Sequence, residues 1–224
     1  MSRIGFLSKE MDDLEQKIDD ARRNFSNAKL LMSSSNYREA RKKLRTVLEA
    51  RPQKTEAYIL LAEAFYQDGM YSHVRTTIHV GVDKTGSKNL NEFLDGKVKV
   101  KYLEGVGLIK ESDYANARKK LRETIELEMG VVGDAKKEHS KTLKAQYWIA
   151  ESYLREGKQR DARIAFRKLL SLPEVKEESY NHAQIHYKLG LSFLAEGKAE
   201  QAHGELRKAL GLDPNHSAKT YLPL

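Results

Sequence analysis

Apolar residues recur along most of the chain at spacings of three and four, with polar residues between them. This period matches the turn of an α helix, so it predicts amphipathic helices throughout. Near the N-terminus the apolar positions form a heptad seam, made of Met11, Leu14, Ile18, Ala21, Phe25, Ala28 and Met32. The seam predicts a long first helix, which would dock on the rest of the fold, pair with a second copy or receive a partner. We expect the docked arrangement, because it would cover the end of the fold.

The pattern also repeats at a larger scale. Residues 37–45 read YREARKKLR, and residues 114–122 read YANARKKLR. Repetition of this length indicates a repeat architecture in place of a single-core domain. Carrying the repeat register described next along the chain gives five repeats, which begin near residues 21, 55, 98, 143 and 183.

The fifth repeat shows the pattern most fully. Positions 7, 8, 11, 20, 24, 27 and 32 of this repeat hold Leu189, Gly190, Phe193, Ala202, Leu206, Ala209 and Pro214. This arrangement resembles the tetratricopeptide repeat (TPR) family, whose unit is a helix–turn–helix of about 34 residues. Small residues at positions 8 and 20 let the two helices, A and B, approach closely. The resemblance implies an all-α fold, a right-handed TPR superhelix (α-solenoid) of five such repeats with an extended N-terminal helix.

The repeat pattern also predicts boundaries. We expect an N-terminal helical extension (1–20), a TPR array (21–216) and a short C-terminal tail (217–224). Extra residues separate the later repeats, and turn formers mark these junctions at 86–89, 130–134 and 172–175.

Two details concern the register of the repeats. Gly69, Gly157 and Gly197 fall at position 15, where helix A turns into helix B and glycine adopts a left-handed backbone at little cost. The third repeat has Glu104 at the apolar position 7, so its register could differ by one turn.

Composition and charge narrow the classes of protein. The 224 residues include 40 Lys+Arg, 32 Asp+Glu and no cysteine, so disulfide frameworks and cysteine-based zinc sites are excluded. The net charge of +8 is spread over both halves, unlike a basic tail that binds nucleic acid. No apolar run approaches about 18 residues, and the N-terminus has no apolar signal core. We expect a soluble, unprocessed cytoplasmic protein, at most peripheral to a membrane or organelle.

Residues that could carry catalysis are sparse. His182 and His186 are four residues apart, but no glutamate stands between them in the metalloprotease position. Gly105 and Gly107 fall inside a predicted helix, so close helix packing explains Gly105 better than a phosphate-binding loop. We therefore predict that the protein is not an enzyme and that it has no catalytic residue, metal site or cofactor.

Large residues recur on a further face of helix A. In a TPR array, positions 2, 5, 9, 12 and 13 line the concave side, and position 5 here is aromatic or isoleucine in every repeat. Contact between neighbouring repeats would also explain these residues. We favour a groove that binds a peptide or an amphipathic helix with acidic flanks. The predicted groove residues are Phe25, Lys29, Ile59, Tyr66, Lys99, Tyr102, Lys144, Tyr147, Arg155 and Tyr187.

Helix B carries a second set of basic residues, which we expect on the convex side. They are Arg41, Lys42, Arg45, Arg118, Lys119, Arg122, Arg163 and Arg167. Acidic protein, anionic lipid or RNA could use such a face, although glutamates lie between these residues and a solvated face is the default.

The resemblance implies a non-enzymatic protein–protein interaction scaffold. Some TPR domains grip the C-terminal carboxylate of a chaperone with Lys and Asn where this chain has Phe25 and Lys29, so that clamp is not implied. We expect a protein partner in the concave groove and assembly of a bacterial organelle or secretion complex, such as a magnetosome. The alternative is an adaptor that binds an anionic membrane surface or RNA through the convex face. Self-association through the N-terminal helix is a further predicted contact, and nucleic acid is the less expected partner.

Overall fold

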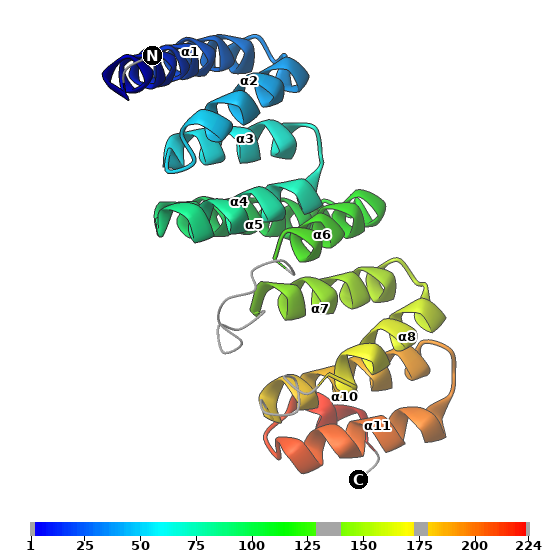
Figure 1. The fold of residues 1–224 in the computed structure, drawn as a ribbon. Coiled ribbons are helices and arrows are strands. Elements are labelled where there is room, and N and C mark those ends of the chain that lie inside the picture. The colour runs from blue at the N-terminus through cyan, green and yellow to red at the C-terminus, as the bar shows by residue number, and fades with distance from the viewer. Residues whose placement is uncertain (1–2, 129–139, 173–178, 223–224) are drawn as a thin grey trace. The chain divides into compact units, whose positions relative to one another are not determined.

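The computed structural model describes residues 3–128, 140–172 and 179–222, and these residues are almost entirely helical (Figure 1). They contain ten α helices, one short 3-10 helix and no strand. The elements are α1 (Arg3–Ser33), α2 (Tyr37–Ala50), α3 (Thr55–Gln67), α4 (Tyr71–Thr85), α5 (Asn89–Lys110), α6 (Tyr114–Glu128), α7 (Ser140–Arg155), α8 (Gln159–Leu170), α10 (Ser179–Leu194), α11 (Ala199–Leu212) and η1 (Ser217–Tyr221). The predicted all-α solenoid of helix–turn–helix repeats is confirmed.

The chain forms two compact units, whose boundary falls within α5. The first unit contains residues up to Lys97, and the second begins at Val98. Each unit is described by itself below.

The five turns between helix A and helix B share one backbone geometry. Position 15 is left-handed in each, with φ of 69° at Gly69, 81° at Gly157 and 71° at Gly197. Ser35 and Ser112 adopt the same conformation, with φ of 58° and 64°. In each turn the next residue donates its N–H to the carbonyl five residues earlier, which ends helix A as a Schellman motif does. The register of the third repeat is therefore the one predicted.

In the third and fifth repeats, a glycine on helix A lies opposite a leucine on helix B. A Cβ placed on Gly105 would lie 2.7 Å from Leu121, and one on Gly190 would lie 2.7 Å from Leu206. Both distances are shorter than a real Cβ contact, so only glycine lets helix A approach helix B this closely.

The junction after α4 shows where extra residues go. Gly86 ends α4 with a left-handed φ of 66°, and α5 begins at Asn89, nine residues before the repeat start at 98. The added residues therefore lengthen helix A of the third repeat. The junctions predicted at 130–134 and 173–175 lie outside the described residues.

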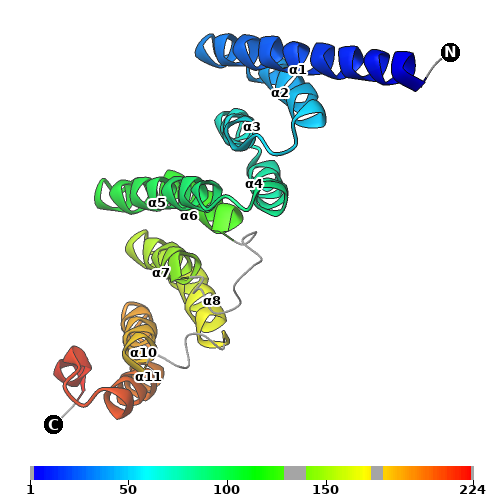
Figure 2. The ribbon, with the colours of Figure 1, turned by 60° about the vertical axis from the view of Figure 1, so that its left-hand side comes forward.

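Helix α1 runs without interruption from the extension into the first repeat (Figure 2). Ala21 and Ala28 are buried, whereas Met11 and Leu14 are 63% and 59% exposed. The expectation that the whole seam docks on the fold is therefore wrong for its first half. The reason is length, because α1 has 31 residues and α2, which packs against it, has 14.

Within the described residues, no helix combines the length and the apolar character that a membrane span requires.

Candidate protein-binding surface

The predicted groove residues of the first unit lie under lysine side chains. The Phe25 ring has the Nζ of Lys29 at 4.7 Å and that of Lys54 at 4.3 Å from its centroid. The Tyr66 ring has the Nζ of Lys97 at 4.5 Å. These are cation–π distances, so each ring has one face covered by an ammonium group. Ile59 is half-buried on α3, the helix that also carries Tyr66.

In the second unit, aromatic side chains from successive helices contact one another. The Nε1 of Trp148 donates to the hydroxyl of Tyr102 at 3.0 Å, which joins α7 to α5. The Tyr147 ring lies edge-on to Trp148 with centroids 6.0 Å apart. Gln184 of α10 donates to the Tyr147 hydroxyl at 3.5 Å.

The same pattern continues to the C-terminal segment. The Nε2 of His216 lies 2.9 Å from the side-chain oxygen of Gln184. Tyr187 has its ring centroid 4.8 Å from His216 and 6.0 Å from Tyr221. Residues of η1 and its N-cap thus contact the last helix A as the next helix A does in the earlier repeats. We call this set the aromatic row: Tyr102, Trp148, Tyr147, Tyr187, His216 and Tyr221.

The rings of the row are neither fully buried nor free. Tyr102, Tyr147, Trp148 and Tyr187 are half-buried, and Tyr221 is 44% exposed. Burial raises the pKa of Tyr187, and its hydrogen bond with Tyr221 adds to that shift. Contact between neighbouring repeats, the alternative left open by the sequence, is therefore present at these positions. Each of these side chains nevertheless keeps part of its surface exposed to solvent.

The basic groove residues of the second unit differ in how firmly they are held. Lys99 and Lys144 are exposed. Arg155 donates its Nε to Glu151 at 3.0 Å, and the same carboxylate receives Lys188 at 3.1 Å. The ion pair with the buried Glu151 holds Arg155 against its own helix α7, although the Arg155 side chain is 47% exposed.

Two residues predicted on the exposed convex face are buried, so the prediction is wrong for them. Arg118 and Arg163 are buried and do not project from an outer surface. Arg118 binds Glu156 at 2.7 Å, and Arg163 binds Glu196 at 3.0 Å. In each case an arginine at position 21 reaches an acidic residue at position 14 of the following repeat. Arg41 makes the same ion pair with Asp68 and also donates to the carbonyl of Ala64.

These arginines also lie over the ring at position 11 of the following repeat. The guanidinium carbon lies 4.3 Å from the Tyr153 centroid for Arg118, 4.7 Å from Phe193 for Arg163 and 5.1 Å from Phe65 for Arg41. We call the three residues Arg41, Arg118 and Arg163 the arginine clamp. Position 25 adds a second arginine to the same side chain in each case: Arg45 and Arg167 lie over the rings of Phe65 and Phe193, and Arg122 donates to the Tyr153 hydroxyl at 3.2 Å. Five residues of the predicted convex face are exposed: Lys42, Arg45, Lys119, Arg122 and Arg167. Lys42 pairs with Glu39 at 2.8 Å.

The clamp lowers the pKa of two carboxylates, those of Glu156 and Glu196. Hydrogen bonds from Lys158 and Arg118 hold the pKa of Glu156 below its ordinary value of 4.5. Hydrogen bonds from Lys198 and Arg163 do the same to the pKa of Glu196. Both carboxylates are therefore charged at neutral pH.

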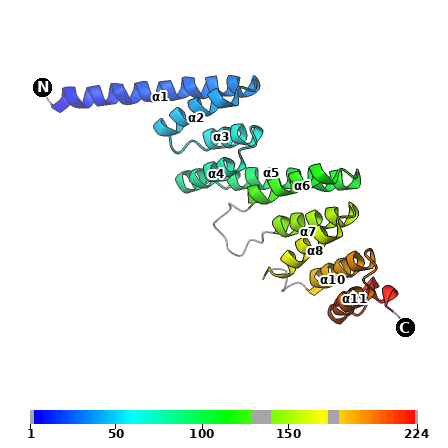
Figure 3. The same ribbon diagram turned by 90° about the vertical axis from the view of Figure 1, so that its right-hand side faces the viewer.

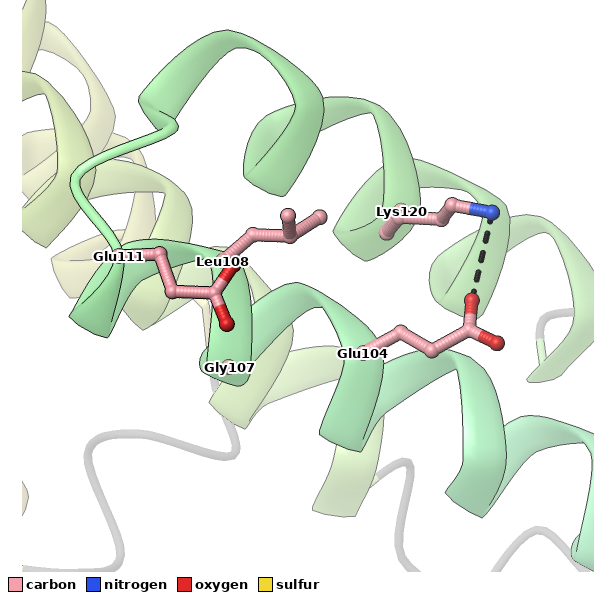
Figure 4. Close-up of a pocket in the computed structure, with 5 residues that line it drawn as sticks. All are labelled: Glu104, Gly107, Leu108, Glu111 and Lys120. Carbon is pink, nitrogen blue, oxygen red and sulfur yellow. Dashed lines mark ion pairs between the residues drawn. The ribbon is translucent and has the colours of Figure 1, made fainter.

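The α5–α6 hairpin carries a hollow on its surface (Figure 4). Glu104, Gly107, Leu108, Glu111 and Lys120 line it, and Lys120 pairs with Glu104 at 3.3 Å. The hollow is open to solvent, so it encloses no substrate. Its charges belong to a network in which the buried Lys101 binds Glu123 at 3.1 Å.

Of the two histidines considered for a metal, His186 contacts a carboxylate of α11. The Nδ1 of His186 lies 2.6 Å from Glu205. Burial opposes ionisation of Glu205, but hydrogen bonds from His186 and Lys208 outweigh it and lower the Glu205 pKa. Among the residues that the structure describes, no group of three His, Asp or Glu side chains is placed to hold a metal ion.

Sequence reasoning missed four members of this surface: Trp148, Gln184, His216 and Tyr221. Gln184 stands at position 2, so reading every concave position in turn would have found it. The arginine clamp had a signal too, because arginine at position 21 and an acidic residue at position 14 recur along the chain.

Several solved structures of other proteins are similar to this chain. The chain is similar to YrrB, described as a TPR protein with an unusual peptide-binding site, at 18% identity over 94% of this chain and 95% of that one, with a TM-score of 0.43. It is similar to MamA at 16% identity over 92% and 98%, with a TM-score of 0.41. The TPR domain of P58(IPK) gives 14% identity over 90% and 54%, with a TM-score of 0.47.

No curated protein matches the sequence significantly. A family model described as a tetratricopeptide repeat matches residues 25–72 and 149–217, which is more than half of the chain. The chain therefore belongs to the tetratricopeptide repeat family, whose members serve in general as scaffolds for protein–protein interaction.

Proposed function

We propose that this protein is a non-enzymatic scaffold that binds a peptide or an amphipathic helix of a partner across the helix-A face of its second unit. The aromatic row is the observation that carries the proposal. Its rings are held by hydrogen bonds and edge contacts to one another, yet their outer edges remain exposed. A surface already ordered before binding loses little conformational entropy when a partner docks.

The charges beside the row indicate the chemistry of the partner. Lys99 and Lys144 are exposed on the same two helices that carry Tyr102 and Tyr147. Apolar anchors would fill the gaps between rings, and acidic residues flanking those anchors would meet the two lysines. The partner is therefore an apolar segment with acidic flanks.

The adaptor function for anionic membranes or RNA receives less support. It requires a continuous basic face on helix B, and the arginine clamp uses three of those cations to join repeats. That this protein assembles a bacterial organelle or secretion complex, such as a magnetosome, stays a prediction. Identifying the partner would test it.

Trp148 allows a direct experiment, since it is the one tryptophan of the chain and belongs to the aromatic row. A synthetic amphipathic peptide with leucines on one face and glutamates beside them would be titrated into the protein while Trp148 emission is recorded. We expect saturable binding with a change in Trp148 emission. Lys99→Glu combined with Lys144→Glu should weaken binding about tenfold and slow association.

The matched control reverses two exposed cations on α8, with Arg160→Glu combined with Lys168→Glu. This variant has the same net charge as the test variant and should bind within about twofold of the wild type. If both variants weakened peptide binding equally, the loss would come from the change in net charge and not from Lys99 and Lys144. Failure of the wild type to bind any such peptide would refute the proposal. Anionic vesicles and single-stranded RNA would be titrated alongside, and salt-sensitive binding to either would favour the adaptor function.

A further inference from the structure

The segment that carries η1 packs on the last repeat, and a buried histidine lies at the joint. Figure 3 shows η1, in red, beside α11 at the C-terminal end of the second unit. Ala218 of η1 is fully buried in a cluster with Leu206 and Ala209 of α11. His216 immediately precedes η1 and is only 6% exposed. A buried histidine must have a hydrogen-bond partner for each ring nitrogen that it hides from water.

Both ring nitrogens of His216 have such a partner, and the two partners require different roles. The backbone N–H of Ala218 donates to Nδ1 at 3.1 Å, which caps the N-terminus of η1. A backbone N–H can only donate, so Nδ1 carries no proton. The proton of the neutral ring is therefore on Nε2, which donates to the side-chain oxygen of Gln184 on α10 at 2.9 Å. The docked segment thus holds the ring neutral and in one tautomer.

We propose that protonation of His216 releases η1 from the last repeat, so that this segment is a pH-sensitive cap. An imidazolium ring donates from both nitrogens and accepts at neither. A proton on Nδ1 would face the N–H of Ala218, and two buried donors would then lie together without an acceptor. This inference does not rest on the proposed function, because it concerns how η1 is held and not what the aromatic row binds.

The groups around His216 do not replace the lost bond. The titratable or charged residues that face it from the surrounding elements are Tyr187 of α10, Asp213 at the end of α11, and Lys219 and Tyr221 of η1. The carboxylate of Asp213 accepts the backbone N–H of Asn215 at 3.0 Å. Among the residues that the structure describes, the side chain bonded to the His216 ring is that of Gln184, an uncharged amide. Docking therefore offers the imidazolium no ion pair in compensation.

Release would uncover apolar surface on the last repeat. The cluster around Leu206 would lose Ala218, together with Leu222, which packs against it. The Tyr187 ring would lose its contacts with His216 and Tyr221. Because the released segment binds a proton that the docked segment excludes, lowering the pH shifts the equilibrium toward release. Histidine changes charge between about pH 5 and pH 8, so this is the range in which the cap should respond.

NMR spectroscopy of the full chain, labelled with nitrogen-15, measures the tautomer and the release in one sample. At about pH 8 we expect a His216 ring with the proton on Nε2 and none on Nδ1. As the pH is lowered to about 5, protonation of this ring should coincide with a shift of the amide signals of residues 217–222 to the positions of an unfolded segment. The amide signals of α7 and α8 should keep their positions over the same range.

His216→Asn separates a pH-sensitive cap from a purely structural one. Asparagine supplies a side-chain oxygen that can cap η1, and it takes up no proton in this range. We expect the released fraction at about pH 5 to fall several-fold in this variant. His79→Asn, which replaces an exposed histidine of α4 in the first unit, should keep the wild-type response. Release of η1 by acid to the same extent in His216→Asn would refute the role of His216.

The wild-type titration alone can also refute the proposal, even if His216→Asn does not dock η1 at about pH 8. A protonated His216 ring with unshifted amide signals for residues 217–222 would show that the charged ring is accommodated in the docked segment. A His216 ring that stays neutral and docked down to about pH 5 would show that the cap does not respond in the range of histidine.

Discussion

At the scale of single residues, the arginine clamp shows that a charged residue can belong to the core of a repeat protein. In Arg118, one guanidinium group lies over the Tyr153 ring and also forms an ion pair with Glu156. Burial of such a group is tolerated because every charge has a partner of opposite sign. The clamp therefore links successive repeats with directional contacts in addition to apolar packing.

The clamp predicts a loss of stability on Arg118→Ala. The substitution removes the ion pair with Glu156, the hydrogen bond to Ser152 and the contact with the Tyr153 ring. The free energy of unfolding should fall by about 2–3 kcal/mol. Urea denaturation followed by circular dichroism would measure it. Lys119→Ala changes the exposed neighbour and should stay within about 0.5 kcal/mol of the wild type. Equal losses from both would contradict a special role for Arg118.

The lowered pKa of Glu156 predicts how stability depends on pH. The folded protein holds this carboxylate ionised more firmly than the unfolded chain does, so the unfolded state binds more protons near pH 4. The stabilisation is fully present above about pH 4.5 and is lost as the pH falls through the lowered pKa. Unfolding by urea at pH 7 and pH 3 should show a smaller difference for Glu156→Gln than for the wild type. Glu49→Gln, which changes an exposed carboxylate on α2, should keep the wild-type difference.

At the scale of helices, close approach within a hairpin depends on glycine at position 8 in the third and fifth repeats. Gly105 and Gly107 belong to the same helix, yet only Gly105 faces a neighbouring side chain. Replacing each glycine by alanine therefore distinguishes the cost of a packing overlap, at Gly105, from the gain in backbone entropy alone, at Gly107.

Gly105→Ala should destabilise the protein by about 1–3 kcal/mol, because the new methyl group would overlap Leu121. Gly107→Ala meets no atom within 4 Å and should stabilise the helix by about 0.5–1 kcal/mol. Thermal and urea unfolding of both variants would measure the difference. A stabilising Gly105→Ala would show that α5 and α6 can separate at no cost, against the packing described above.

Much of the helical architecture could be predicted from the sequence, since the period of apolar residues and the small residues at position 8 report on local packing. The buried arginines are harder to predict, because a basic residue on helix B reads as exposed until the recurring acidic residue at position 14 of the next repeat is matched to it. The tyrosines at position 5 are a similar case. Their hydroxyl partners, Trp148 for Tyr102 and Gln184 for Tyr147, come from a different repeat, and the inter-repeat distance that joins them is not encoded in any one helix.

At the scale of the whole molecule, the second unit has cores of its own along the chain. One cluster surrounds Leu121, another Phe166, and a third joins Leu206 to Ala218 of η1. Within this unit each hairpin contacts the next in sequence, so the stability of the unit is a sum of local terms and does not come from one global core. A substitution that weakens the contact between two hairpins should therefore destabilise those two hairpins and leave distant ones unchanged.

Arg163→Ala tests this expectation by hydrogen exchange. Amides of α10 and α11 should lose protection, because the substitution removes the ion pair with Glu196 and the contact with the Phe193 ring. Amides of α2 and α3, in the first unit, should exchange as in the wild type. A uniform loss of protection over both units would indicate a single cooperative fold instead.

The clamp also makes each hairpin a module with a direction. Every internal repeat carries an acidic residue at position 14 and an arginine at position 21, as Glu111 and Arg118 do in the third. The first repeat has Ser34 in the acidic place, and the last has His203 in the arginine place. An internal hairpin duplicated in tandem would therefore bring a matching charge to each new joint, whereas two whole chains fused end to end would meet with serine against histidine.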